Sequence, residues 1–448
     1  MTEKFSKIGF VLAMAGSAVG LGNAWKFPTM VGNNGGSAFI LLYVLLTLGI
    51  ACVAFLAELA IGALGKKNVV GSIHDLAPSH KNAWEKSGFF MIGAVLIASF
   101  YMVVIGWIFY YTAISFGKLP ATTQEAGDTF GALVSNKPLV VTIYFSVIFF
   151  IVFYTVSKGI KSGIEKLNKF MMPALIILLV LLLAYAVLKS GHFAEALSFI
   201  FVPDFSKIAN SQIILQALGL AFFSMSMGVT TVSTYAASLP EKTNLVKSTL
   251  SIVSINILIG IMMGLVVFSF IPLQEGVPAA SGPGLIFVSL ASLFAQMGVV
   301  GNFLAVAFFV SLLFAGITSA VSMIEPFVAY LIGQHGVSRK KALLYIGVFI
   351  YTLGVFCILS YYEQTAAVFN FFGKPFFDVL DFFTSNILMP LGAITFSIFV
   401  GWVIDQNKLW ALFSEFMSRT AFNIWLFALR FVVPLAIIAI GAYQFYAL

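Results

Sequence analysis

The chain consists largely of long apolar runs separated by short polar connections. Eleven of these runs are long enough to cross a bilayer as a helix, which takes about 20 apolar residues. They lie at roughly 8–31, 38–63, 88–116, 138–156, 168–188, 213–236, 248–273, 303–333, 342–361, 376–403 and 422–446. Only 9% of the 448 residues are charged, against about 25% in soluble domains. Strands of a membrane barrel would be half as long and would alternate in polarity. The sequence therefore predicts an all-α polytopic membrane protein with eleven transmembrane helices.

The net charge of +7 indicates membrane topology rather than a nucleic-acid partner. Basic residues concentrate in connections that share a side with the N-terminus, such as Lys66–Lys67 and Lys340–Lys341, and are scarce in the others. Because Lys and Arg favour the cytoplasmic side, we expect a cytoplasmic N-terminus. The odd number of spans then places the C-terminus on the outer side of the cell inner (plasma) membrane. A nucleic-acid patch would need a basic cluster on a soluble domain, and the short loops leave no room for one.

Polar and small residues interrupt the first apolar run. The stretch GSAVGLGNAWKFP, residues 16–28, holds three glycines and a proline, which are costly in a helix that must satisfy its own backbone in lipid. The sixth run has a similar interruption at 224–231. A helix that breaks inside the membrane frees carbonyl and amide groups to hold ions and a small polar molecule. Glycines that only let helices pack closely are the alternative.

The two interruptions lie five helices apart, which favours a 5+5 inverted repeat with unwound helices 1 and 6. The first repeat would cover about 8–188, the second about 213–403, and an extra helix about 422–446. Two unrelated polar helices would leave a similar pattern. We expect a single transmembrane transporter domain over residues 1–448. The outer connection at 274–302 is expected to form a hairpin of short helices.

Five motifs in order resemble the neurotransmitter:sodium symporter family, and the resemblance covers nearly the whole chain. They are AGSAVGLGNAWKFP from residue 15, NNGGSAF at 33–39, AFFSMS at 221–226, FAGITSAVSMIEP at 314–326 and FFDVLDFFTSNILMPLG at 376–392. The resemblance, closest to bacterial amino-acid transporters, implies the inverted-repeat transporter fold. It also implies sodium-coupled symport of a neutral, hydrophobic amino acid into the cell by alternating access, with no enzymatic activity.

The resemblance implies one or two sodium ions held by oxygen atoms, the ligands that a hard cation prefers. The first sodium site would combine the substrate carboxylate with Ala18, Asn23, Ser224 and Asn256. The second would consist of Gly16, Val19, Ala315, Thr318 and Ser319. An isolated intramembrane Asn can instead make an interhelical hydrogen bond, and adjacent hydroxyls can bond back to their own helix.

The resemblance further implies a substrate pocket between the unwound helices. Its residues would be Ala18, Gly20, Leu21, Gly22, Ile97, Tyr101, Phe223, Ser224, Ser226, Val229, Ser319 and Met323. Free amides near Leu21 and Gly22, with the Tyr101 hydroxyl, would hold a carboxylate, since half-helix N-termini carry partial positive charge. Amine transporters of the family carry an Asp where this chain has Gly20, so the substrate should bring its own carboxylate. Ordinary packing is the alternative role for Phe223 and Tyr101.

Charged residues inside the spans are costly unless they are paired or hydrated. The resemblance implies that Lys26 and Asp381 close the outer mouth as a gate, although the family has Arg at the first position and Lys lacks its bidentate geometry. Glu58 would accept hydrogen bonds from the backbone of the unwound segments. Glu325 stands near the inner gate, and its role stays open.

Four further positions bear on ion coupling and give no single answer. Gly163 and Pro173 match a family spacing that allows local unwinding beside the second sodium, although such a proline is often only a kink. Chloride-dependent members carry Gln at the position of Leu220, and chloride-independent bacterial ones carry a carboxylate near Gly260, so chloride dependence is undecided. The oligomeric state is not set by the sequence. A channel would need a continuous polar face and an enzyme a catalytic cluster; a sensor built on the same fold is the remaining alternative.

Overall fold

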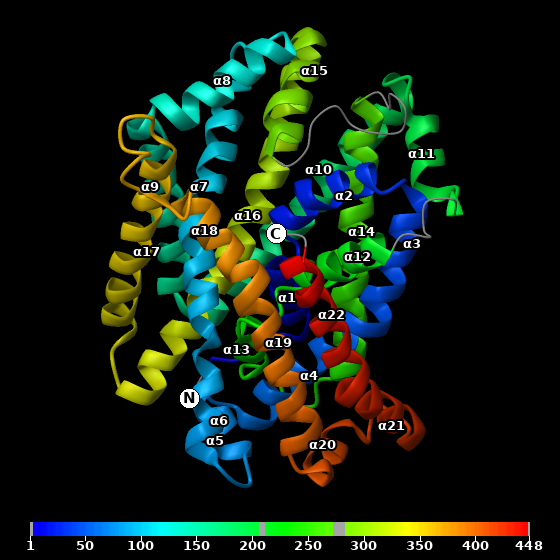
Figure 1. The fold of residues 1–448 in the computed structure, drawn as a ribbon, viewed down its shortest axis with the longest axis vertical. Coiled ribbons are helices and arrows are strands. Elements are labelled where there is room, and N and C mark those ends of the chain that lie inside the picture. The colour runs from blue at the N-terminus through cyan, green and yellow to red at the C-terminus, as the bar shows by residue number, and fades with distance from the viewer. Residues whose placement is uncertain (1–2, 206–210, 272–282, 447–448) are drawn as a thin grey trace.

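The computed structural model describes residues 3–205, 211–271 and 283–446, and helices make up most of it (Figure 1). The helices of the first half are α1 Lys7–Ala18, α2 Phe27–Asn33, α3 Ser37–Leu46, α4 Cys52–Gly65, α5 Val69–Leu76, α6 Lys81–Trp84, α7 Met91–Ile114, α8 Thr123–Asn136, α9 Pro138–Ser157, α10 Lys166–Lys189 and α11 Phe193–Phe201. Those of the second half are α12 Ser211–Ser224, α13 Thr231–Ala236, α14 Leu245–Phe270, α15 Ala291–Gln296, α16 Gly298–His335, α17 Arg339–Tyr361, α18 Phe376–Phe383, α19 Met389–Ile398, α20 Gln406–Phe413, α21 Arg419–Phe427 and α22 Val433–Tyr446.

Short turns of wider or tighter helix join several of these elements. They are η1 Gly22–Lys26, η2 Thr47–Ala51, η3 Glu85–Phe90, η4 Ile160–Glu165, η6 Leu285–Leu290, η7 Thr384–Leu388, η8 Phe399–Val403 and η9 Ala428–Val432. In the described ranges, one pair of two-residue antiparallel strands is present, β1 Asn370–Phe371 and β2 Lys374–Pro375. Because most turns continue the axis of a neighbouring helix, they lengthen it into a span rather than ending it.

Nine helical stretches within the described residues are long and apolar enough to cross a membrane. They are Ser37–Gly65, Lys81–Ile114, Pro138–Ser157, Ile160–Lys189, Leu245–Phe270, Gly298–His335, Arg339–Tyr361, Phe376–Val403 and Arg419–Ala442. One further span is broken, α1 followed by Gly22–Asn33. The shorter apolar helix α12 is followed, after a second break, by α13. Counted with the broken first span, the described residues give ten candidate spans, and the predicted all-α membrane fold is confirmed.

The two breaks fall where the sequence predicts them. The halves of the first span meet at 66°, and Val19 at the bend has an extended backbone with ψ of 97°. In the second break, Ser226, Gly228 and Thr230 have positive φ angles of 52°, 83° and 65°. Left-handed backbone of this kind is uncommon for residues other than glycine, so the chain between α12 and α13 leaves the helical path completely.

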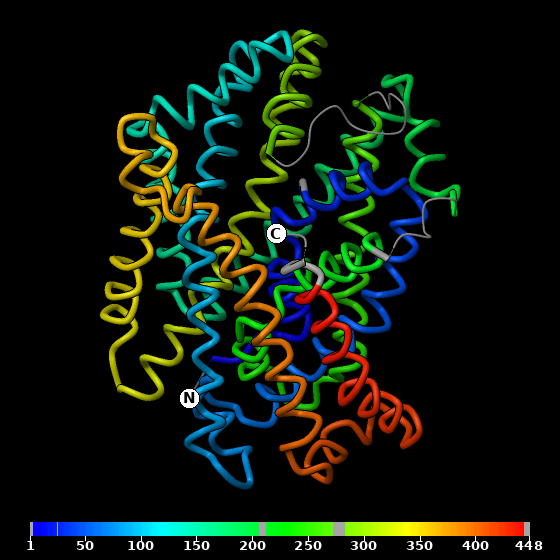
Figure 2. The backbone as a smooth tube through the Cα atoms, viewed as in Figure 1, coloured from blue at the N-terminus to red at the C-terminus, as the bar shows by residue number. Residues whose placement is uncertain are grey.

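The broken helices lie at the centre of the molecule. In Figure 2 the dark blue tube of α1 runs through its middle, and α1 packs against α10, α14 and α16. Helices α7 and α16 pack closely along each other. In Figure 1, α8, α11 and α15 lie at one end of the bundle, and α5, α6 and α20 at the other. Continuous helices therefore form a scaffold around the two interrupted ones.

The outer connections differ in part from the sequence-based expectation. Helices α8 and α11 occupy connections for which no helix was predicted. In the connection at 274–302, residues 272–282 lie outside the described part. The remainder is one helical stretch, η6 with α15, and α16 already begins at Gly298 rather than near 303. The described residues of this connection give one short helix, and the expected hairpin falls partly on residues outside the described part.

Gly62 allows α4 to pack closely against α13. A Cβ atom there would collide with the Ser233 carbonyl oxygen and lie 2.7 Å from the Ala236 Cβ. We therefore expect Gly62→Ala to lower the free energy of unfolding by about 1–3 kcal/mol, as overpacking does. Gly49, in the same span, has nothing within 4 Å of its Cβ position, so Gly49→Ala is the matched control. Thermal unfolding in detergent measures both, and equal midpoints for the two variants would contradict this packing.

Candidate functional site

A small cavity of about 50 Å³ lies between the two broken helices. It is lined by Ala18, Gly20, Gly22, Ile97, Phe100, Tyr101, Phe223, Ser224, Ser226, Val229, Thr231, Ser319, Met323, Ser385 and Met389. This set contains every predicted substrate-pocket residue except Leu21, which lines the adjoining outer cavity. The prediction missed Phe100, Thr231, Ser385 and Met389. Ser385 and Met389 lie in the motif at 376–392 in span ten, and that motif could have identified them from the sequence.

Glycines create the space at the first break. A Cβ atom on Gly20 would lie 2.5 Å from the Tyr101 hydroxyl oxygen and 2.8 Å from the Ser319 Oγ. One on Gly22 would lie 2.8 Å from the Phe223 ring. Any larger side chain at these two positions would occupy the cavity itself. The interruption of α1 is therefore needed both for the bend and for the volume beside it.

A backbone amide and a phenol meet at the same break. The Leu21 N–H donates a hydrogen bond to the Tyr101 hydroxyl oxygen at 2.8 Å. Tyr101 comes from the middle of α7, whose close packing with α16 fixes its position. Within the described residues, no charged side chain lines the central cavity. The polar groups at this end are thus dipoles, which suit the carboxylate of a zwitterion.

Three of the four predicted first-sodium residues, Asn23, Ser224 and Asn256, form one buried polar cluster. Asn23 Nδ2 donates to Asn256 Oδ1 at 2.9 Å, and Asn256 Nδ2 donates to Ser224 Oγ at 3.1 Å. The Tyr43 and Ser224 hydroxyls lie 3.1 Å apart. The Asn23 Oδ1 atom is buried and accepts no hydrogen bond from any described residue. A buried acceptor without a donor is costly, and a hard cation would satisfy it, so this donor set fits sodium.

The predicted second sodium residues also converge. The Ser319 hydroxyl lies 3.1 Å from the Gly16 carbonyl oxygen, 3.0 Å from that of Ser17 and 3.3 Å from that of Val19. The Thr318 hydroxyl lies 3.1 Å from the Ala315 carbonyl oxygen. The Ser319 contacts join α16 to the end of α1 at its break, as a bridging cation would, whereas the Thr318–Ala315 contact lies within α16. The Thr318 hydroxyl also donates to the Phe314 carbonyl oxygen at 2.9 Å. The alternative role for this hydroxyl, a hydrogen bond within its own helix, is therefore present as well.

A cavity of about 480 Å³, called the outer cavity after the predicted topology, adjoins the central one on the side of α8. Lys26 and Asp381 both line it, but the described residues contain no ion pair between them. The Lys26 ammonium lies 3.6 Å from the centre of the Phe223 ring instead. Asp381 accepts a hydrogen bond from Ser385 Oγ at 3.1 Å. The predicted gate between Lys26 and Asp381 is thus not closed by a direct contact in this structure, and the face of the Phe223 ring holds the ammonium by a cation–π contact.

Glu58 lies against the second break, as the resemblance implies. Its Oε1 accepts a hydrogen bond from the Gly228 N–H at 2.7 Å, and its backbone carbonyl accepts one from Ser233 Oγ at 3.0 Å. In span five, by contrast, the chain is not unwound in this structure. Gly163 belongs to the π-helical turn η4, which runs directly into α10, and Pro173 lies inside α10.

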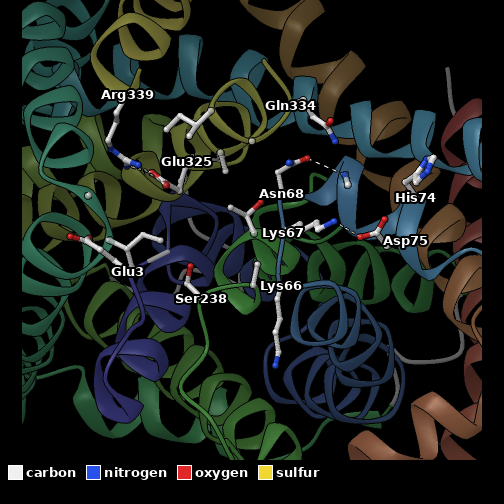
Figure 3. Close-up of a pocket in the computed structure, with 18 of the residues that line it drawn as sticks. Glu3, Lys66, Lys67, Asn68, His74, Asp75, Ser238, Glu325, Gln334 and Arg339 are labelled. Atoms are coloured by element: carbon white, nitrogen blue, oxygen red, sulfur yellow. Dashed lines mark hydrogen bonds and ion pairs between the residues drawn. The ribbon is translucent and has the colours of Figure 1, made fainter. Parts of the chain in front are cut away.

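A larger cavity of about 810 Å³ opens at the opposite end (Figure 3). Glu325, which is 2% exposed, makes an ion pair with Arg339 at its edge. Arg339 Nε also donates to the Val156 carbonyl oxygen at 2.8 Å. At the mouth, Lys67 lies 2.5 Å from Asp75, and this hydrogen bond lowers the pKa of the Asp75 carboxyl. The sequence left the role of Glu325 open, and the structure gives it a charged partner.

The segment before α1 is fastened to span five at this end. Ser6 donates to the Glu165 carboxylate from its N–H at 2.9 Å and from its hydroxyl at 2.6 Å. Lys169 lies 2.5 Å from the same carboxylate. Phe5 is buried and packs against Tyr235, which belongs to α13. The start of the chain thus covers the ends of both broken helices on the side of the large cavity.

Comparison with known proteins agrees with this arrangement. The sequence model of the sodium:neurotransmitter symporter family matches residues 2–129 and 126–447. An uncharacterised sodium-dependent transporter of Bacillus subtilis is 36% identical over 440 residues, covering 97% of this chain and 96% of its own. The Drosophila melanogaster sodium-dependent serotonin transporter is 25% identical and covers 86% and 71%.

A solved structure matches as well. The crystal structure of MhsT in complex with L-phenylalanine superposes with a TM-score of 0.87 at 33% identity, covering 98% of this chain and 99% of that one. The family consists of transporters, in agreement with the expectation that the chain is not an enzyme. The chain belongs to the sodium:neurotransmitter symporter family and is a sodium-dependent symporter that crosses the membrane many times.

Proposed function

We propose that the chain couples sodium entry to the uptake of a neutral, hydrophobic amino acid across the plasma membrane by alternating access. The observation that carries this is the position of the Leu21 amide and the Tyr101 hydroxyl. They lie at the break that also places Asn23 beside Asn256. An amino-acid carboxylate held at this break would face both the amide and the first sodium. The L-phenylalanine bound in MhsT supports the substrate class.

The walls of the central cavity favour an apolar substrate side chain. Ile97, Val229 and Met323 line it, and among the described residues its lining carries no charge. The substrate ammonium would face carbonyl dipoles and hydroxyls, because Gly20 offers no carboxylate. Methionine is flexible and adapts to different shapes, so Met323 would let the cavity expand around side chains of different size.

The two oxygen clusters favour the binding of two sodium ions. The first would be shared with the substrate carboxylate, and the second would tie α1 to α16. Next to the first cluster, Leu220 is buried and apolar, and the side chain nearest the Gly260 Cβ position is the Phe27 ring at 3.5 Å. At these two positions the chain therefore supplies neither the amide of chloride-dependent relatives nor the carboxylate of chloride-independent ones.

Access to the central cavity in this conformation favours the outer side. The outer cavity shares Gly22, Phe100, Tyr101 and Phe223 with it, whereas the inner cavity shares none of its lining residues. We assign closure on the outer side to the approach of Lys26 and Asp381. We assign closure on the inner side to the pair of Glu325 and Arg339. In this arrangement the N-terminus lies in the cytoplasm. The whole chain then acts as one domain built from the repeats at about 8–188 and 213–403.

Binding of sodium and substrate should be reciprocal. Because both meet at the Asn23 cluster, sodium should tighten substrate binding, and substrate should tighten sodium binding by the same factor, typically about 5–150-fold. Equilibrium binding of radiolabelled amino acids to the purified protein measures this in sodium and in choline at equal ionic strength. Substrate affinity that is the same in both salts would refute sodium coupling at this site.

The substrate should need its carboxylate. L-Phenylalanine, leucine or methionine should compete for binding, whereas phenethylamine, the decarboxylated form of phenylalanine, should not. The amine alone would leave the first sodium without the carboxylate that shares its site, and a buried charge without a partner is costly. Competition binding in sodium measures the difference, for which we expect at least about 100-fold, or roughly 3 kcal/mol. Equal competition by the amine would overturn the proposed role of Gly20.

The Glu325–Arg339 pair should be coupled in stability. Arg339→Ala alone leaves a buried carboxylate without its partner, and we expect it to cost about 3–5 kcal/mol. The double variant with Glu325→Gln should be less unstable than this single variant, because it leaves no buried charge. Lys340→Ala, next in sequence and exposed, is the control and should change little. Unfolding midpoints measure all of them, and purely additive effects would argue against the pair.

A further inference from the structure

Asn168, near the start of α10, has a buried side-chain oxygen without a partner. The residue is fully buried, and its Nδ2 donates to the Ile164 carbonyl oxygen at 2.9 Å. That bond fixes the orientation of the amide, since the flipped group would set two oxygens against each other. The Oδ1 atom must then face the opposite way, where no described residue donates to it.

This oxygen faces residues assigned to the second sodium. A Cβ atom on Gly16 would collide with Asn168 Oδ1 and would lie 3.0 Å from the Thr318 Cβ. Asn168 therefore adjoins α1 just before its break, on the side that faces α16. The packing of α10 against both α1 and α16 holds it there.

The neighbouring donors are already engaged. The Ser319 hydroxyl lies within hydrogen-bond distance of three carbonyl oxygens at the break, and the Thr318 hydroxyl donates within its own helix. Lys169 extends to Glu165. A buried amide oxygen in this position has acceptor capacity that a cation, or the water of a cation, would use.

We propose that Asn168 contributes its amide oxygen to the second sodium site, adding span five to the two helices that already provide oxygens. This inference rests on the proposed sodium-coupled function. Sodium then links α10 to α1, and η4, which directly precedes α10, runs from the cytoplasmic end where Glu165 holds Ser6. Loss of the ion removes one of the ties between the first broken helix and span five.

Stabilisation by sodium alone tests this without transport. The full-length protein is unfolded by heat in detergent, without substrate, over a series of sodium concentrations in which choline keeps the ionic strength constant. A ligand that binds the folded state raises its stability by mass action. Asn168→Leu keeps a similar volume but has no oxygen, and it should raise the half-effective sodium concentration about tenfold.

Two companion variants separate binding from packing. Asn168→Asp keeps an oxygen and adds negative charge, so its half-effective sodium concentration should equal or fall below that of the wild type. Met172→Ala removes buried apolar contacts one turn further along α10. It should lower the unfolding midpoint while leaving the half-effective sodium concentration unchanged.

Each outcome bears on a distinct claim. A wild-type sodium concentration dependence in Asn168→Leu overturns the role of Asn168 and leaves the proposed function standing. If Asn168→Leu does not fold, Asn168→Asp decides: sodium binding as tight as or tighter than wild type supports the role, and weaker binding overturns it. A wild-type protein that sodium does not stabilise overturns this inference together with sodium coupling.

Discussion

The break in α1 is the constraint on which the functional site depends. Backbone groups that leave a helix inside an apolar bundle must find partners other than water. The carbonyls of Gly16, Ser17 and Val19 lie at the Ser319 hydroxyl, and the Leu21 amide meets Tyr101. These partners come from α16 and α7, which pack along each other. The scaffold thus satisfies the groups that the break exposes, and the site is built from the same contacts.

The second break is also stabilised by hydrogen bonds to neighbouring helices, but these helices are different ones. The Glu58 carboxylate on α4 accepts a hydrogen bond from the Gly228 N–H. The Ser226 hydroxyl donates one to the Ser17 carbonyl oxygen at 2.9 Å. The last bond joins the two breaks directly. Because the broken helices contact each other as well as the scaffold, a movement of one relative to α16 must exchange several hydrogen bonds at once. Sodium ions between them would add to the bonds that such a movement has to break.

The sequence predicts the fold and the breaks well, because glycine, proline and single polar residues are conspicuous in apolar runs. Asn23 and Asn256 were found in this way. Pairings that depend on side-chain packing could not be found: Lys26 lies on Phe223 rather than at Asp381, and Arg339 reaches back to Glu325. The helices α8 and α11 lie in connections between apolar runs, and they are amphipathic rather than apolar throughout, so a search for apolar runs passes over them.

Asn168 shows why a boundary residue is easily missed. It lies between Lys166 and Lys169, where the fifth apolar run begins. This pattern is typical of the polar end of a span. In the structure the helical stretch begins earlier, at Ile160, and α10 packs against α1 and α16. Asn168 is therefore fully buried. Its surroundings are set by tertiary contacts, which no local pattern in the sequence records.

The central claim, that a sodium gradient drives amino-acid uptake, is tested most directly by concentrative uptake into proteoliposomes. With sodium outside and potassium inside, labelled phenylalanine or leucine should accumulate above its external concentration. Accumulation should vanish when sodium is equal on both sides and the membrane potential is clamped at zero. Undiminished accumulation without sodium, driven by a proton gradient alone, would contradict the account.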